Sequence, residues 1–170
     1  MKKVLLNFLM LFSIITYSQN GIHKNEEGVF YVQFSEEIET KLKAEEMKKI
    51  VAEKLKKDFP TINFTEEGKD FFQYQGGFRV KWNVPMVGYE TVGVSLRCRT
   101  EFKDGKYRIT WENFRIGQEQ EPLNKFYDSA KERKQKAIDE KISESIVETK
   151  DYIIKAINES TNQKKDEDKW

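Results

Sequence analysis

Five basic residues form the most promising group for chemistry in this sequence. They stand at alternate positions of segments whose other positions are mostly apolar, so a strand would place them on the face opposite the core. Their positions are Arg79, Lys81, Arg97, Arg99 and Arg108. Guanidinium and ammonium groups that share one open sheet face would bind an anionic ligand.

Acidic residues nearby give this patch a second interpretation. We expect the apolar positions Val80 and Leu96 to pair across two strands. That pairing would place Arg79 opposite Arg97, which is unfavourable unless other groups neutralise the two charges. Arg99 would then be the least compensated of the set. The carboxylates that would act as cross-strand partners belong to Glu101 and Glu112. An anion site and a set of surface ion pairs both remain open.

Residue types that usually carry catalysis are scarce. His23 is the only histidine and lies in a polar N-terminal segment, which argues against two-histidine metal motifs and serine–histidine–aspartate triads. Cys98 is the only cysteine, and strand alternation directs it into the core, away from the arginines beside it. We therefore interpret Cys98 as a small core residue rather than a nucleophile, and predict no disulfide within the chain.

Acidic pairs and a glycine pair are the remaining candidates. Gly76-Gly77 lacks the lysine and the further glycines of a phosphate-binding loop, so it marks a bend or a bulge. The acidic groups lack the spacing of a calcium loop and are interpreted as solvated surface. They are Glu36-Glu37, Glu45-Glu46, Glu66-Glu67 and Asp166-Glu167-Asp168. We predict no metal site, no cofactor and no catalytic residue.

Several predicted strands position these residues. Segment 29–34 is rich in β-branched and aromatic residues, and 61–64 is a short strand. Segments 78–84 and 92–102 alternate apolar with polar residues, and residues 85–90 turn the chain between them.

Asp104-Gly105, between two alternating segments, predicts a tight hairpin turn. The turn sets a register in which Cys98 faces Trp111 on the inner side. A slip of one residue would invert both faces, so agreement between the turn and the pattern supports this register. The pattern breaks at Asn113-Phe114, where we expect a bulge or the end of the strand. The same register pairs opposite charges on the outer side, Glu101 with Arg108 and Arg97 with Glu112.

Two helices accompany the strands. Ser35 or Thr40 would cap the first, which carries an apolar stripe and ends before Pro60. The second would run from Pro122 to about Ser160, roughly 55 Å at 1.5 Å per residue. A domain of this size is only about 30 Å wide, so this helix must kink, turn back or overhang. Residues 161–170 are predicted to be a disordered charged tail.

The first 18 residues have the order of a secretory signal peptide. Lys2 and Lys3 precede an apolar run from Val4 to Ile15, and small side chains follow before Gln19. The run is shorter than the roughly 20 residues of a spanning helix, which favours a cleaved signal over a retained anchor. We expect an exported protein, periplasmic or secreted, with a leader at 19–27 and one domain at 28–160.

Composition excludes some functions. The formal net charge of the 170-residue chain is +1, and removal of Lys2 and Lys3 would make it −1. A chain this balanced has no general attraction for nucleic acid. With 38% hydrophobic and 13% aromatic residues, the sequence can form one core without disulfides.

The order strand, helix, antiparallel strands, long helix, together with the passage 103–108 and Asn113-Phe114, resembles a family of exported bacterial domains of unknown function. That family has a TATA-box-binding-protein-like fold. The resemblance implies an α+β domain, a curved antiparallel sheet with two helices packed on one face, in the order β-α-β-β-β-β-α. It supplies no catalytic residue and implies no DNA binding.

The sequence favours a non-enzymatic exported domain that binds a ligand through its open sheet face. The ligand would be an anionic small molecule, a glycan or a protein. The alternative is a structural or assembly protein that associates with itself through the overhanging part of its C-terminal helix.

Overall fold

The computed structural model describes residues 23–26 and 29–167, with side chains up to Thr161. The predicted signal peptide lies outside the described residues. The strands are β1 (His23–Lys24), β2 (Phe30–Glu37), β3 (Phe64–Glu67), β4 (Phe71–Val84), β5 (Gly88–Lys103), β6 (Lys106–Ile116) and β7 (Glu121–Pro122). The helices are α1 (Ala44–Asp58), α2 (Leu123–Ser129) and α3 (Glu132–Glu167).

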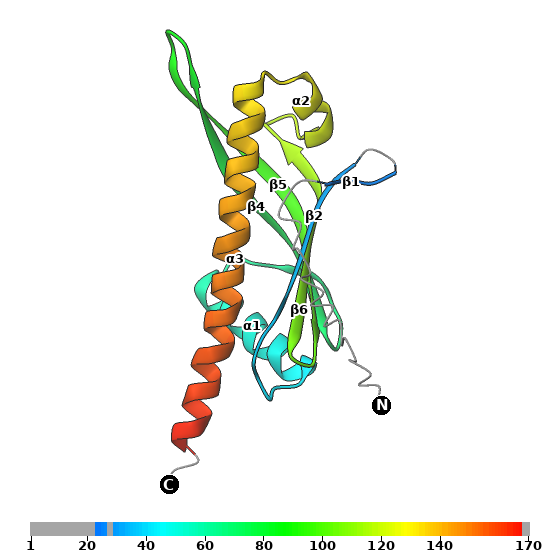
Figure 1. Ribbon diagram of the computed structural model, residues 1–170, viewed down its shortest axis with the longest axis vertical. Helices are drawn as coiled ribbons and strands as arrows, with labels where there is room; N and C mark the ends of the chain where they lie inside the picture. Colours follow the sequence, from blue (N-terminus) through cyan, green and yellow to red (C-terminus); the bar gives the residue numbers. More distant parts are fainter. Residues whose placement is uncertain (1–22, 27–28, 168–170) are drawn as a thin grey trace, which may run out of the picture.

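The described strands form one antiparallel sheet in the order β1-β2-β6-β5-β4-β3, with β7 paired to β6. Helix α3 runs along one face of this twisted sheet, α1 packs beside its C-terminal half, and the β4–β5 hairpin extends past α3 as an arm (Figure 1). The expected α+β architecture with a curved antiparallel sheet is therefore confirmed, although there are three helices rather than two.

The core lies between the inner face of the sheet and the helices. The inward rows of the four long strands are buried together with the apolar stripes of α1 and α3. The stripe on α3 extends from Ile138 to Ile157, and both of these side chains are fully buried. At about 25 cal/mol per Å² of buried apolar surface, this contact is the main stabilising term for a chain whose one cysteine, Cys98, is free.

The β5–β6 hairpin has the predicted register. Cys98 pairs with Trp111, and the turn residue Gly105 has a φ of 69°. A bulge interrupts the pairing beyond Arg97, where Asn113 has a φ of 55°. The bulge keeps Phe114 buried after the break in alternation.

The start of α1 differs from the prediction. Ser35 lies within β2, and Thr40 accepts a bond from the Leu42 amide before the helix begins. The first amide of the helix, Ala44 N, instead donates to Asp104 Oδ1 at 2.9 Å. The hairpin turn thus satisfies a helix end 60 residues earlier in the chain, which sequence spacing could not reveal.

The predicted single C-terminal helix is divided. Ala130 is extended, with φ −78° and ψ 147°, and separates α2 from α3. The break lets α2 place Phe126 against Trp82 at 6.1 Å while α3 follows its own line across the sheet. One straight helix could not make both contacts. The backbone of α3 continues to Glu167, where the sequence predicted a disordered tail from Thr161.

The β4–β5 turn is tighter than predicted. Val84 pairs with Gly88, so only Pro85–Val87 form the loop, with Met86 at a φ of 68°. Leu96 therefore pairs with Gly76, and the expected pairing of Val80 with Leu96 is wrong.

Three boundaries differ as well. Strand β2 continues to Glu37, β3 begins at Phe64 rather than Thr61, and β4 begins at Phe71 rather than Phe78. None of the helices in the described part of the chain is long and apolar enough to cross a membrane.

We expect Gly105→Val to lower the free energy of unfolding by about 1 kcal/mol or more, because a β-branched residue fits a positive φ poorly. Gly93→Val is the matched control, since a Cβ there meets no atom within 4 Å and the φ is outside the left-handed region. Urea unfolding of both variants measures the difference. Equal midpoints for Gly105→Val and the wild type would contradict the assignment of strain to this turn.

Candidate functional site: a groove between the long helix and the sheet edge

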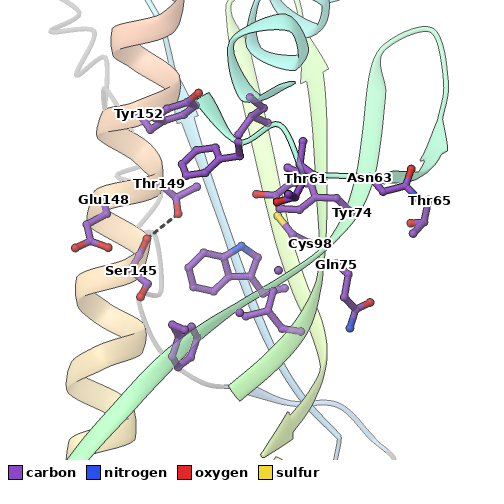
Figure 2. Close-up of a pocket in the computed structure, with 18 of the residues that line it drawn as sticks. Thr61, Asn63, Thr65, Tyr74, Gln75, Cys98, Ser145, Glu148, Thr149 and Tyr152 are labelled. Carbon is purple, nitrogen blue, oxygen red and sulfur yellow. Dashed lines mark hydrogen bonds between the residues drawn. The ribbon is translucent and has the colours of Figure 1, made fainter. Parts of the chain in front are cut away.

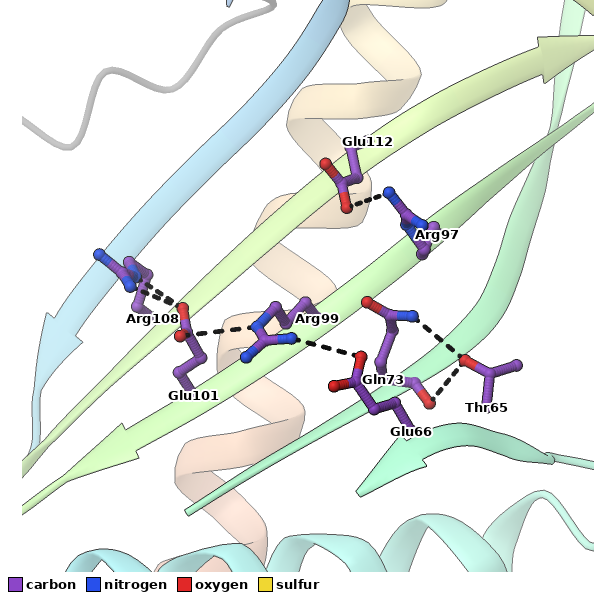
Figure 3. Close-up of polar contacts among 8 residues, drawn as sticks. All are labelled: Thr65, Glu66, Gln73, Arg97, Arg99, Glu101, Arg108 and Glu112. Atoms are coloured by element: carbon purple, nitrogen blue, oxygen red, sulfur yellow. Dashed lines mark hydrogen bonds and ion pairs between the residues drawn. The ribbon is translucent and has the colours of Figure 1, made fainter. Parts of the chain in front are cut away.

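Arg97, Arg99 and Arg108 lie on the outer face of the sheet, and the long helix lies behind the strands (Figure 3). Arg97 Nη2 lies 2.7 Å from Glu112 Oε1, and Arg108 Nη2 lies 2.7 Å from Glu101 Oε2. Both pairs were predicted. These arginines are therefore neutralised within their own sheet, and a ligand anion would have to compete with these carboxylates.

Arg99 was expected to be the least compensated, but it contacts two carboxylates. Its guanidinium lies 3.5 Å from Glu101 and 3.5 Å from Glu66, and it stacks 3.9 Å from the centre of the Phe71 ring. Glu66 lies in β3, and the strand predicted at 61–64 ended before this residue.

Arg79 and Lys81 lie apart from the three arginines, towards the tip of the arm. Arg79 pairs with Gly93 rather than with Arg97, because the tight β4–β5 turn shifts the register. The Lys81 ammonium lies 4.2 Å from the centre of the Tyr89 ring. Among the described residues neither cation has a carboxylate partner within ion-pair distance. The structure therefore divides the predicted patch into a compensated part and an uncompensated pair.

A groove with a volume of about 970 Å³ opens between α3, the inner side of β4 and the segment after α1. Figure 2 shows Ser145 and Thr149 on the helix facing Tyr74 and Cys98 on the strands. Its lining consists of Leu55, Phe59, Thr61, Ile62, Asn63, Thr65, Tyr74, Gln75, Gly76, Gly77, Phe78, Arg79, Leu96, Cys98, Trp111, Lys141, Ser145, Glu148, Thr149 and Tyr152.

Short side chains on both walls create this groove. Gly76 lies between Tyr74 and Phe78 on the inward row of β4. The remaining residues of this row, from Phe72 to Val84, are aromatic residues or valine. Ser145 and Thr149 stand opposite on α3, between its isoleucines. A Cβ at Gly76 would make ordinary van der Waals contact with the Tyr74 and Leu96 side chains, at 3.5 Å or more, so a side chain there would meet no backbone.

Gly77 has a different role. A Cβ there would lie 2.5 Å from the carbonyl oxygen of Val94, so β5 approaches β4 too closely for any side chain. The glycine pair was predicted to mark a bend or a bulge. The pairing of β4 with β5 passes through both glycines without a register shift, so there is no bulge between these strands. Gly76 lines the groove, and Gly77 allows the two strands to pack closely.

Burial controls the ionisable groups of the groove floor. It raises the pKa of the Cys98 thiol to about 11, and it also raises the pKa of Tyr74, whose hydroxyl lies near the sulfur. At neutral pH both groups are protonated. Cys98 is therefore a poor nucleophile, in agreement with its interpretation as a core residue.

The rim of the groove carries both polar and apolar side chains. Tyr152 donates a hydrogen bond to Asp58 Oδ2 at 3.1 Å, and burial together with this bond raises the pKa of the tyrosine. The Phe59 ring is 52% exposed beside it. Lys141 and Glu148 stand along the helix side. The arrangement suits a largely apolar ligand with a few polar groups.

Sequence reasoning missed this groove. Gly76 was noted, and so was the apolar stripe of α3, but only the observed register brings Gly76 opposite Ser145 and Thr149. Two features of the sequence could have indicated it. Ser145 and Thr149, one helical turn apart, interrupt the apolar stripe of α3, and Gly76 interrupts the inward row of a strand.

Comparisons with solved structures show what the fold is similar to. A DUF4468 family protein from Bacteroides ovatus ATCC 8483 aligns with a TM-score of 0.57 at 13% identity, over 79% of this chain and 89% of its own. A TBP-like protein from Parabacteroides distasonis ATCC 8503 aligns with a TM-score of 0.41 at 14% identity, over 52% of this chain and 56% of its own. Family models and curated proteins gave no match to the sequence.

The DUF4468 alignment agrees with the α+β fold that the sequence resemblance implies. At 13% identity the DUF4468 alignment establishes a shared fold. It transfers no ligand and no residue role, so the function must be argued from the groove and the sheet of this chain.

We expect Cys98 to resist a thiol reagent such as Ellman's reagent at pH 8 in the native protein and to react once the chain is unfolded. Because its native pKa is about 11 against an ordinary 9.0, the unfolded chain loses the proton first. Stability should therefore decrease as pH rises above 9, by up to about 1.4 kcal/mol per pH unit from this group. Cys98→Ala should remove that part of the slope. Rapid labelling under native conditions would contradict the inward assignment.

Proposed function

We propose that this chain is an exported, non-enzymatic binding domain whose ligand occupies the groove between α3 and β4. The observation that carries the proposal is the groove itself, about 970 Å³ in volume and formed by short residues on both facing walls. Ligand sites are typically about 300–1,000 Å³, mainly apolar, with a small number of polar groups.

The lining indicates the chemistry of the ligand. Leu96 and Trp111 form an apolar floor, and the Phe59 and Phe78 rings stand at the sides. The Thr149 hydroxyl donates to the Ser145 carbonyl, so within the groove lining its oxygen remains an acceptor. A ligand with an apolar body and a few hydrogen-bond donors would match these walls.

Binding fits the groove better than catalysis. Its lining contains no histidine, and its one thiol is protonated at neutral pH. Among the described residues, neither the Ser145 nor the Thr149 hydroxyl is hydrogen-bonded to a carboxylate or an imidazole that could act as a general base. Glu148 is the only carboxylate of the lining, so a pair of carboxylates for acid–base chemistry is not present in it.

The outer sheet face is the second candidate, through the predicted anion patch. Arg79 and Lys81 favour it, because neither has a carboxylate partner among the described residues. Arg97, Arg99 and Arg108 favour it less, because Glu66, Glu101 and Glu112 already neutralise them. The groove is therefore the stronger site for a small molecule.

Assembly through the C-terminal helix has less support. The apolar stripe of α3 is buried in its own domain as far as Ile157. Val147 is the one large apolar side chain that the described part of α3 exposes, at 54%. A helix–helix interface needs a continuous apolar stripe, and a single valine does not provide one.

Export rests on the N-terminal sequence, where two lysines, a short apolar run and small residues precede Gln19. We expect the mature protein from its native host to begin within a few residues of Gln19 and to be found outside the cytoplasm. Intact-mass measurement of the envelope and extracellular fractions checks this. A full-length mass that includes Met1 would contradict export by signal cleavage.

The groove is tested with the fluorescent probe 8-anilinonaphthalene-1-sulfonate, which has an apolar ring system and one anionic group. We expect saturable binding to the native protein, and at least about tenfold weaker binding to Gly76→Leu, whose side chain would fill the groove. Gly93→Leu adds the same side chain at a position where a Cβ meets no atom within 4 Å, and should bind as the wild type does.

Thermal unfolding of each variant verifies that the probe reports on a folded protein, since partly folded chains also bind this dye. Equal affinity of Gly76→Leu and Gly93→Leu would overturn the groove as the binding site.

A further inference from the structure

Strand β4 has a free edge along most of its length. Strand β3 pairs with it only over Phe72–Tyr74. From Gln75 to Val84 the only described strand that bonds to β4 is β5, on the other side. From Gln75 to Val84, this penultimate strand therefore has an edge that no described strand pairs with.

The register shows which backbone groups point to this edge. The Phe102 amide donates to the Asp70 carbonyl at 2.8 Å, and the β4–β5 pairing continues without a shift. In an antiparallel pair, alternate residues bond to the same neighbour. The even-numbered residues of β4 thus bond to β5, and the odd-numbered ones direct N–H and C=O outward. In agreement, Phe71 O accepts from Gly68 N on the β3 side. The outward set is Gln75, Gly77, Arg79, Lys81 and Asn83.

This edge is also a wall of the groove. Residues 75–79 line it, together with Thr61 and Asn63 before β3 and Thr65 within it. A strand added to the edge would continue the line of β3 past Tyr74. Its side chains would alternate, because successive residues point to opposite faces. One row would enter the groove beneath α3, and the other would lie on the outer face beside Arg79 and Lys81.

Charge determines what the outer row should be. Among the described residues, Arg79 and Lys81 have no carboxylate partner within ion-pair distance, whereas Arg97 and Arg108 each have one. Acidic side chains at alternate positions of an added strand would supply the missing partners. A second copy of β4 would instead place these two cations against each other, which is unfavourable.

We propose that the occupant of this site is an extended polypeptide segment that alternates acidic and apolar residues and adds to β4 as a further strand. This inference rests on the proposed function, because its apolar side chains would occupy the same groove. Main-chain hydrogen bonds to the odd-numbered residues provide affinity, and the groove and the two cations provide selection.

The test uses the full chain and a capped hexapeptide that alternates glutamate and valine. We expect saturable binding by calorimetry and slower amide hydrogen exchange at Gly77, Arg79 and Lys81, while Phe78 and Val80 exchange slowly with or without the peptide. A peptide that alternates lysine and valine should bind about tenfold more weakly, since two favourable charge pairs become repulsive. The Arg79→Glu, Lys81→Glu double variant should reverse this preference, and Arg97→Glu, on the same face but away from the edge, should not.

Backbone pairing is tested with a glutamate–valine peptide that is N-methylated at the residues facing the edge. We expect it not to bind, because it lacks the donors that the strand needs. Equal binding of the methylated peptide would overturn strand addition. A dimer of the free chain with slow exchange at Gly77 and Arg79 would identify a second copy as the occupant and would also overturn it.

The two proposals fail separately. If no peptide binds while the naphthalene probe binds the wild type and not Gly76→Leu, the peptide inference is wrong and the groove function remains. If neither binds, both are wrong.

Discussion

A straight helix can cover a twisted sheet along one line only, and the remaining structure depends on this geometry. Strands in a sheet rotate by about 20–25° from neighbour to neighbour, whereas α3 runs straight across them (Figure 1). The chain has no disulfide with which to hold a thinner core, so the contact between this helix and the sheet must supply most of its stability. Where the helix and the sheet diverge, other elements must fill the space: α2 at one end, through Phe126 on Trp82, and α1 at the other.

The groove is the place where this filling is incomplete. Gly76 on the strand and Ser145 and Thr149 on the helix leave space that larger residues would have occupied. Interiors are otherwise packed to the density of organic crystals, so a large opening lined by short residues on both sides is a property of the sequence and not a consequence of loose packing. Beyond Tyr74, no described strand pairs with β4 on the side opposite β5, because β3 begins at Phe64, the residue that pairs with Tyr74.

Charged side chains on the outer face of the sheet differ from those at its free edge in whether they form ion pairs. On the outer face, cross-strand pairs such as Arg97 with Glu112 neutralise the arginines, and pairs of this kind contribute at most about 1 kcal/mol each when exposed. Their main effect is to oppose slippage of the register and to keep an exposed sheet soluble. Arg79 and Lys81 stand outside this system, at the free edge. Cations on an edge strand discourage pairing with most other chains, and they leave acidic segments as the compatible partners.

Local patterns in the sequence determined the strands around the Asp104-Gly105 turn, the inward position of Cys98 and the ion pairs across β5 and β6. They also determined the amphipathic helices. Each of these features follows from apolar periodicity or turn chemistry within a few residues. Tertiary structure decided the rest. The Asp104 carboxylate caps α1 from 60 residues away in the chain. The break at Ala130 allows α2 and α3 to make separate packing contacts. The three-residue β4–β5 turn pairs Leu96 with Gly76 instead of Val80. The groove exists only in that last register, since nothing local to Gly76 specifies which residues of α3 will stand opposite it.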